Sequence, residues 1–208
     1  MLIKDVISDL VSELEALEDK FLQHHLDSAT IETPDQYRLD VKAFAVLAHA
    51  AMEQAFEDMC EAVADSTASE YEANGTTTTV TLSLLAFVAS PLPIKTDDKT
   101  ITLNPRENHL HALGASIKEF KQSIILRNQG MSCKYLGKLL APIAISTVPD
   151  VDELDAINQL KDIRGESAHR YQARVVADPK VILQHVGFCY RYFRKVTTEA
   201  ARLIGEVL

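Results

Sequence analysis

The sequence predicts an all-α fold, and three observations lead to that prediction. Apolar residues recur at spacings of three and four along several long segments, which places them on one face of a helix. Glycine and proline number only seven each among 208 residues, so little interrupts those segments. The apolar fraction of 47% is ordinary, and a chain of this length can bury a sizeable core. We therefore expect residues 1–208 to form a single domain, a bundle of long antiparallel helices.

Residues 3–26 form the first predicted helix. Its apolar positions alternate at spacings of four and three: Ile3, Ile7, Leu10, Leu14, Leu17 and Phe21. His24 and His25 follow at the end of this helix. Adjacent helical residues point apart, so we expect an exposed helix end here and not a pair of metal ligands.

The second predicted helix begins at Thr33-Pro34, a capping residue followed by a proline suited to the first turn. It extends to about Ala68, and its apolar face comprises Val41, Phe44, Ala48, Met52, Phe56, Met59 and Val63. His49 lies among small residues of this helix. We expect a core or interface histidine whose hydrogen bonds are satisfied.

The middle of the chain is less regular. Residues 80–90 are short and apolar, and periodicity does not decide between a helix and a strand. Residues 91–105 are rich in turn formers and predict a loop or a small hairpin. A helix is expected over 108–128, and Ser132 caps a short helix that ends near Leu140.

Two further helices are predicted in the last third. One begins at Asp150 or Asp152 and carries Leu154, Ile157, Leu160 and Ile163 at a spacing of three. The other begins at Asp178-Pro179 and extends almost to Leu208. Four basic residues lie off its apolar stripe and are candidates for a basic rim: Arg191, Arg194, Lys195 and Arg202.

Charge is distributed unevenly along the chain. The net charge of −9 argues against a general nucleic-acid binder. Residues 1–73 carry a net charge of −13, residues 74–160 are balanced, and residues 161–208 carry +4. Positive charge therefore collects in the last segment, as a phosphate-binding surface requires, although a solvated helix face would give the same pattern.

An Arg-x-x-x-x-His motif, Arg164–His169, follows the apolar stripe. Histidine can transfer a proton near neutral pH, and arginine binds phosphate oxygens in a fork. Five steps of about 100° put the two side chains about 140° apart on an unbroken helix. Either the helix breaks, which Gly165 would allow, or a second copy of the chain supplies the partner group. Arg106–His111 has the same spacing, but its context after Pro105 in a polar connection favours Arg164–His169.

The segment 163–170, Ile-Arg-Gly-Glu-Ser-Ala-His-Arg, resembles the HEPN superfamily of all-α domains, and more closely its RiboL-PSP-HEPN branch. Residues 130–145 are also similar to that branch, and the resemblance covers roughly residues 115–205. Many active members carry a polar residue directly after the arginine, where this chain has Gly165.

The resemblance implies a metal-independent endoribonuclease in which the 2′-hydroxyl attacks the adjacent phosphate at a site shared by two subunits. It implies that Arg164 and His169 are catalytic, in a homodimer that acts on RNA in a toxin–antitoxin or phage-defence setting with a neutralising protein partner. Further candidates for RNA contact are Lys161, Glu166, Ser167, Arg170 and Tyr171. We expect no metal, no cofactor and no membrane span, and we expect a cytoplasmic protein whose three cysteines are reduced.

Two other interpretations stay open at this stage. Arg164 and His169 could be a helix-end arginine and a buried, hydrogen-bonded histidine with no catalytic role. Alternatively the chain is a non-catalytic dimeric module that binds a nucleotide or a protein partner, which Gly165 and the acidic composition favour.

Overall fold

The computed structural model describes residues 1–28, 32–87, 105–128, 130–169 and 177–208, with the backbone alone described for 105–108 and 166–169. Every regular element in these residues is helical, which confirms the all-α prediction. Within the undecided segment 80–90, residues 80–87 are helical and belong to α4 (Thr79–Phe87), and residues 88–90 lie outside the described residues. The predicted loop or hairpin at 91–105 lies outside the described residues except for Pro105.

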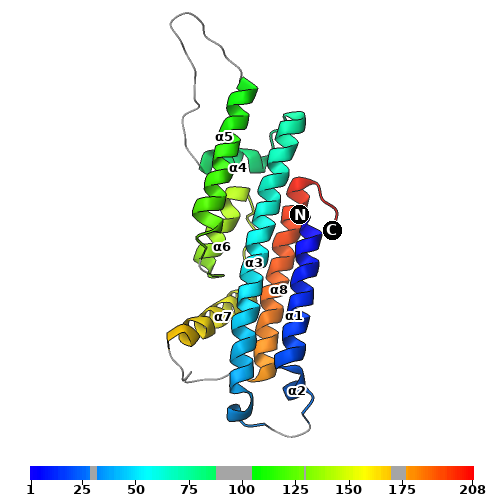
Figure 1. Cartoon of the computed structure of the whole chain (residues 1–208), viewed down its shortest axis with the longest axis vertical. Helices are drawn as coiled ribbons and strands as arrows, with labels where there is room; N and C mark the ends of the chain where they lie inside the picture. The colour runs from blue at the N-terminus through cyan, green and yellow to red at the C-terminus, as the bar shows by residue number, and fades with distance from the viewer. Residues whose placement is uncertain (29–31, 88–104, 129, 170–176) are drawn as a thin grey trace, which may run out of the picture.

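Three long helices form the main body of the molecule: α1 (Ile3–Phe21), α3 (Pro34–Asn74) and α8 (Pro179–Ile204). Helix α1 is antiparallel to the other two (Figure 1). All seven predicted apolar positions of α3 are buried, and Phe56 of α3 meets Phe193 of α8 edge-on with ring centroids 5.0 Å apart. The chain ends also meet, since the backbone N–H groups of Ile3 and Lys4 donate to the Glu206 carboxylate at 3.1 Å.

Several helix ends differ from the prediction. The first helix ends at Phe21, and the fully buried Leu22 separates it from the short helix α2 (Gln23–Leu26). Helix α3 continues past Ala68 to Asn74, and Gly75 then ends it with a φ of 68°. Helix α8 ends in the same way at Gly205, whose φ is 71°. Glycine adopts this left-handed conformation without the steric cost that other residues bear.

Helices α4, α5 (Pro105–Phe120) and α6 (Cys133–Leu140) pack beside the upper and middle parts of α3 (Figure 1). The helix expected over 108–128 begins earlier, at Pro105, and passes into a π-helical turn, Lys121–Ile125. Arg106 therefore lies in a helix and not in a connection. The predicted cap of α6 is confirmed, because the Ser132 side chain accepts a hydrogen bond from the backbone N–H of Tyr135 at 3.4 Å.

Helix α7 (Val151–His169) lies at an angle to the long helices (Figure 1) and is unbroken through Gly165. Its buried face differs from the predicted stripe. Ile157 and Leu160 are buried, but Leu154 is 40% exposed and Glu153 is buried in its place. Residues three positions apart are rotated by about 300° around the helix axis, so a stripe of four such residues drifts around the helix.

Among the described residues, no helix has both the length and the apolar character needed to cross a membrane. Cys60, Cys133 and Cys189 are all free thiols, as predicted.

Candidate functional site

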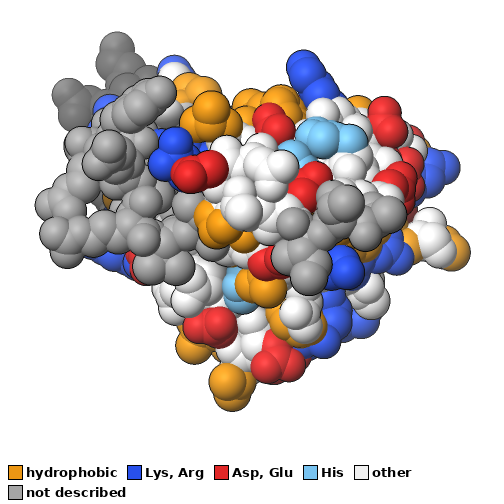
Figure 2. Space-filling model, turned by 90° about the horizontal axis from the view of Figure 1, so that it is seen from below, with side chains coloured by type: hydrophobic (Ala, Val, Ile, Leu, Met, Phe, Trp, Pro, Cys, Tyr) orange, Lys and Arg blue, Asp and Glu red, His pale blue; other side chains and the backbone are white. Residues whose placement is uncertain are grey.

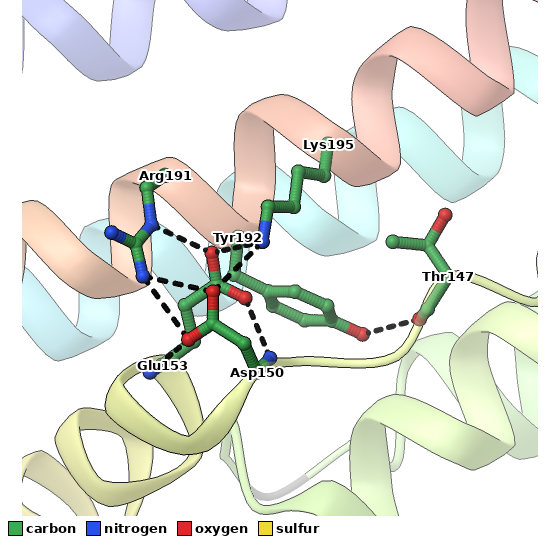
Figure 3. Close-up of polar contacts among 6 residues, drawn as sticks. All are labelled: Thr147, Asp150, Glu153, Arg191, Tyr192 and Lys195. Carbon is green, nitrogen blue, oxygen red and sulfur yellow. Dashed lines mark hydrogen bonds and ion pairs between the residues drawn. The ribbon is translucent and has the colours of Figure 1, made fainter.

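The start of α7 is fixed to α8 by a cluster of charged side chains (Figure 3). Asp150 and Glu153 cap the helix, each side chain accepting a hydrogen bond from the other's backbone N–H at 2.9–3.0 Å. Arg191 donates to both carboxylates at 2.9–3.0 Å, and Lys195 lies 2.7 Å from the Glu153 carboxylate. This clamp determines how α7 leaves the body of the molecule.

The same cluster corrects the predicted basic rim. Arg191 and Lys195 are engaged by Asp150 and Glu153 and do not form an open cationic surface. Hydrogen bonds from Lys195 and Arg191 lower the pKa of the Glu153 carboxyl despite its burial, so it is ionised at neutral pH. The two cations and two carboxylates of this cluster offset one another, so the cluster contributes little net attraction for RNA.

Arg164 lies near the other end of α7 and faces α3. Its guanidinium is 3.7 Å from the carboxylate of Glu53, and its side chain is 42% exposed while that of Glu53 is 14% exposed. A separation of 3.7 Å is an ion pair and too long for a bidentate hydrogen-bonded fork. Glu53 therefore holds Arg164 from the protein side, and the Arg164 side chain is half-exposed.

His49 lies one turn before Glu53 on the same face of α3. It is fully buried, and neither ring nitrogen has a hydrogen-bond partner among the described residues. Its Nδ1 is 3.7 Å from the Glu53 carboxylate. The prediction of a core histidine is thus confirmed, but the prediction that its hydrogen bonds are satisfied is wrong. The small residues around His49 in the helix predict that it is buried, but they do not show whether another segment supplies a hydrogen-bond partner.

Burial controls the protonation of this pair. It lowers the pKa of His49 to about 4, with the positive charge of Arg164 acting in the same direction. It also raises the pKa of Glu53, although Arg164 and a backbone hydrogen bond from Gly130 act against that rise. At neutral pH His49 is therefore an uncharged imidazole beneath the Arg164–Glu53 pair.

Asn128 and Gly130, which lie between the π-helical turn and α6, are close to this pair. Asn128 donates to the Glu57 carboxylate at 2.9 Å, one turn along α3 from Glu53. Gly130 has a φ of 130°, and a Cβ atom there would lie 2.9 Å from an Arg164 guanidinium nitrogen and 3.4 Å from the His49 ring. Only glycine fits such a backbone conformation and such a close approach without strain. We define His49, Glu53, Gly130 and Arg164 as the α3–α7 site.

The other predicted site residues are described to different degrees. His169 is the last residue of α7, and Glu166 and Ser167 lie in the same helix, but their side chains are outside the described residues. Arg170 and Tyr171 are outside them altogether. Lys161 is on an exposed part of α7, 3.3 Å from the Asp162 carboxylate. In the alternative pair, His111 is exposed on α5, and the Arg106 side chain is not described.

Comparisons with models of known protein families, with curated proteins and with solved structures found no match to this chain. The site must therefore be interpreted from its own chemistry.

The described residues of the site are a half-exposed guanidinium beside a carboxylate, with a buried neutral imidazole under them. A guanidinium held at a fixed place can bind a phosphate oxygen and offset its charge. The course of α7 limits how Arg164 and His169 can act together. Because α7 does not break at Gly165, Arg164 and His169 leave one helix about 140° apart. Of the two explanations offered by the sequence, the broken helix is excluded.

Proposed function

We propose that this protein is a metal-independent endoribonuclease of the HEPN type. Its active sites form where two copies of α7 meet in a homodimer, so that Arg164 of one chain and His169 of the other act on the same phosphate. The resemblance of the motif to the HEPN superfamily supplies the reaction, and the α3–α7 site supplies the fixed arginine that this reaction needs.

The observation that supports the proposal best is the unbroken helix between Arg164 and His169. The two side chains leave one helix about 140° apart, and Glu53 holds Arg164 towards α3, so we expect them not to converge on one phosphorus atom within one chain. A two-fold axis beside the helix would bring the arginine of one chain towards the histidine of the other, because each contact in such an interface occurs twice.

The proposed reaction is a transfer at phosphorus. The substrate 2′-oxygen forms a bond to the adjacent phosphorus as its proton passes to a base, and the bond from phosphorus to the 5′-oxygen breaks as that oxygen receives a proton. The products are a 2′,3′-cyclic phosphate and a 5′-hydroxyl. His169 transfers a proton as general base or general acid. Arg164 holds the scissile phosphate and offsets the charge that builds on its oxygens in the transition state.

Glu53 and His49 act on this reaction through Arg164. Glu53 fixes the guanidinium by charge, and the neutral His49 packs beneath it without adding a second cation. Lys161 and Arg170 would add contacts to flanking phosphates, with Tyr171, Ser167 and Glu166 as further RNA-contacting or orienting groups.

A second candidate function is a non-catalytic dimeric module that binds a nucleotide or a protein partner. It is favoured by the Glu53 carboxylate 3.7 Å from Arg164, which offsets part of the positive charge that an RNA phosphate would meet. Gly165, at a position that is polar in many active relatives of the motif, favours it as well.

The resemblance also suggests a cellular role. A ribonuclease of this type would act in the cytoplasm as a toxin or a phage-defence factor, held inactive by an antitoxin or another regulatory protein. The acidic first third of the chain, net −13 over residues 1–73, offers a surface for a basic partner of that kind.

The experiment that tests the proposal is RNA cleavage by the purified protein in the presence of EDTA. His169→Ala should lower the rate by roughly 100- to 10,000-fold and Arg164→Ala by roughly 100- to 1,000-fold. The matched controls are Arg106→Ala and His111→Ala, the pair with the same spacing on α5, which should cleave like the wild type.

Three results would count against this assignment. Loss of cleavage in the α5 variants alone would move the site to Arg106 and His111. Cleavage that EDTA abolishes would contradict a metal-independent reaction. A wild-type dimer that binds a panel of RNAs and cleaves none of them would support the binding module.

A further inference from the structure

A cluster of histidines and carboxylates lies at the end of the molecule that carries α2, outside the α3–α7 site. Figure 2 views this end, where histidine side chains lie among acidic ones. The members of the cluster are His24 and His25 of α2 and Asp40 in the second turn of α3, and their ligand atoms all lie within 4.8 Å of one another. The prediction that the two histidines point apart is wrong. The angle between neighbours applies to their Cβ atoms, whereas the ring nitrogens lie beyond two rotatable bonds.

The distances suit ligands of one metal ion. Nε2 of His25 is 3.0 Å from an oxygen of Asp40, and Nε2 of His24 is 3.5 Å from the same oxygen. Ligands at about 2.0–2.1 Å from a tetrahedral ion are about 3.3 Å apart. The two imidazole rings lie close together, with centroids 3.8 Å apart. The three donor atoms therefore already surround a position that an ion can occupy with small side-chain movements.

A second carboxylate orients the buried histidine. The side chain of His25 is 5% exposed, and its Nδ1 lies 2.6 Å from an oxygen of Glu32. Both ring nitrogens lie against carboxylates, so without an ion the ring donates one proton to Glu32 and one to Asp40; a metal ion would replace the proton on Nε2, while the Nδ1 proton stays with Glu32. Metal-binding histidines commonly have such a carboxylate partner on the other ring nitrogen. The His25 ring also meets the buried Tyr37 ring edge-on, with ring centroids 6.2 Å apart, and this contact fixes its position.

The composition of the cluster indicates which ion fits. Two imidazoles and one carboxylate suit Zn²⁺ and similar transition metals, whereas Mg²⁺ and Ca²⁺ prefer oxygen ligands. His24 and Asp40 are 55% and 39% exposed, so an ion can enter and keep water in the remaining position. The acidic first third of the chain raises the local concentration of cations.

We propose that His24, His25 and Asp40 form a Zn²⁺ site, with Glu32 orienting His25. The ion would fasten α2 to the first turns of α3. Asp40 and Glu53 are thirteen residues apart on α3, or about 20 Å, so the ion does not reach the phosphate proposed to bind Arg164. The site is structural and independent of the proposed ribonuclease reaction, which proceeds in EDTA.

The test uses the full chain, stripped of metal with EDTA and then dialysed into metal-free buffer. Isothermal titration calorimetry with Zn²⁺ should give saturable binding of one ion per chain. Zn²⁺ should also raise the Tm by a few degrees, because it binds the folded state. Co²⁺ should give the visible absorption of a site with nitrogen and oxygen ligands. All proteins carry Cys133→Ser, which removes the exposed thiol as a competing ligand.

Variants separate this site from other metal-binding groups. His24→Ala and Asp40→Asn, both at partly exposed positions, should keep the fold and lose the one-ion binding. Glu32→Gln should weaken it by roughly 10- to 100-fold. His111→Ala, an exposed histidine on α5, should bind like the parent. Absence of saturable Zn²⁺ binding, or equal binding by His24→Ala and Asp40→Asn, would overturn the proposal and leave a hydrogen-bonded cluster without metal.

Discussion

His49 should make the protein less stable than an apolar residue in its place. Its two ring nitrogens are buried without hydrogen-bond partners among the described residues, and an unsatisfied polar group of this kind costs about 1–3 kcal/mol. We therefore expect His49→Leu, which keeps a similar volume, to raise the free energy of unfolding at pH 7 by about 1–3 kcal/mol.

The pH dependence provides a second magnitude. The pKa of His49 falls from 6.5 in the unfolded chain to about 4 in the folded one. The unfolded state therefore binds a proton first as the pH drops, and stability is lost between pH 6.5 and 4. At pH 5 this loss is about 2 kcal/mol for the wild type. His49→Leu should lack it.

Urea unfolding at pH 7.5 and at pH 5 measures both effects. The difference between the wild type and His49→Leu isolates His49, because acidic groups elsewhere titrate equally in both proteins. His111→Leu, at an exposed position on α5, is the control and should change neither value. A wild type and a His49→Leu variant that lose the same stability between these pH values would refute this account of His49, as would a variant that is less stable than the wild type at pH 7.5.

Three further predictions concern α7 and its neighbours. Glu153→Ala should lower the free energy of unfolding by about 1–2 kcal/mol in chemical denaturation, because two half-exposed cations lose a buried partner. The control Asp152→Ala should lower it by under about 0.5 kcal/mol, and equal effects of the two variants would rule out the clamp. Gly165→Ala should raise the Tm and the free energy of unfolding, the latter by about 0.5–1 kcal/mol, since α7 is helical there and a Cβ atom meets nothing within 4 Å. A lower Tm would mean that this position of the helix needs glycine. Glu53→Gln should slow RNA cleavage by roughly 10-fold with little change in KM, because Arg164 loses its positioning carboxylate. The control Glu57→Gln should cleave at the wild-type rate. A wild-type rate for Glu53→Gln would show that Glu53 does not act on the reaction.

Periodicity predicted the fold well where helices are long and amphipathic. The apolar face of α3 was predicted residue by residue, since a repeat of three and four over many turns has one helical solution. Helix ends were less accurate. The break at Leu22 comes from a residue buried by tertiary packing, and the π-helical turn after α5 has no local signal.

The candidate site was predictable only in part. Arg164 follows from the motif, but Glu53 lies 111 positions earlier in the numbering, and nothing in the local sequence of α3 identifies it as the partner. The clamp on Arg191 and Lys195 was missed for the same reason. Their charge suggested a basic rim, whereas the carboxylates that engage them come from the start of α7. The spacing of apolar residues along the chain predicts helices, but it does not predict which charged side chains tertiary packing brings together.

The claim that Arg164 of one chain works with His169 of another is tested most directly by mixing two inactive variants. Arg164→Ala and His169→Ala are purified, combined in equal amounts under conditions that exchange subunits, and assayed for RNA cleavage in EDTA beside the wild type. Half of the dimers are then mixed, and each mixed dimer keeps one intact pair of the two, so about a quarter of wild-type activity should return. If the wild type cleaves and the exchanged mixture stays inactive, the two residues do not act across a dimer interface and the proposed composite site is wrong.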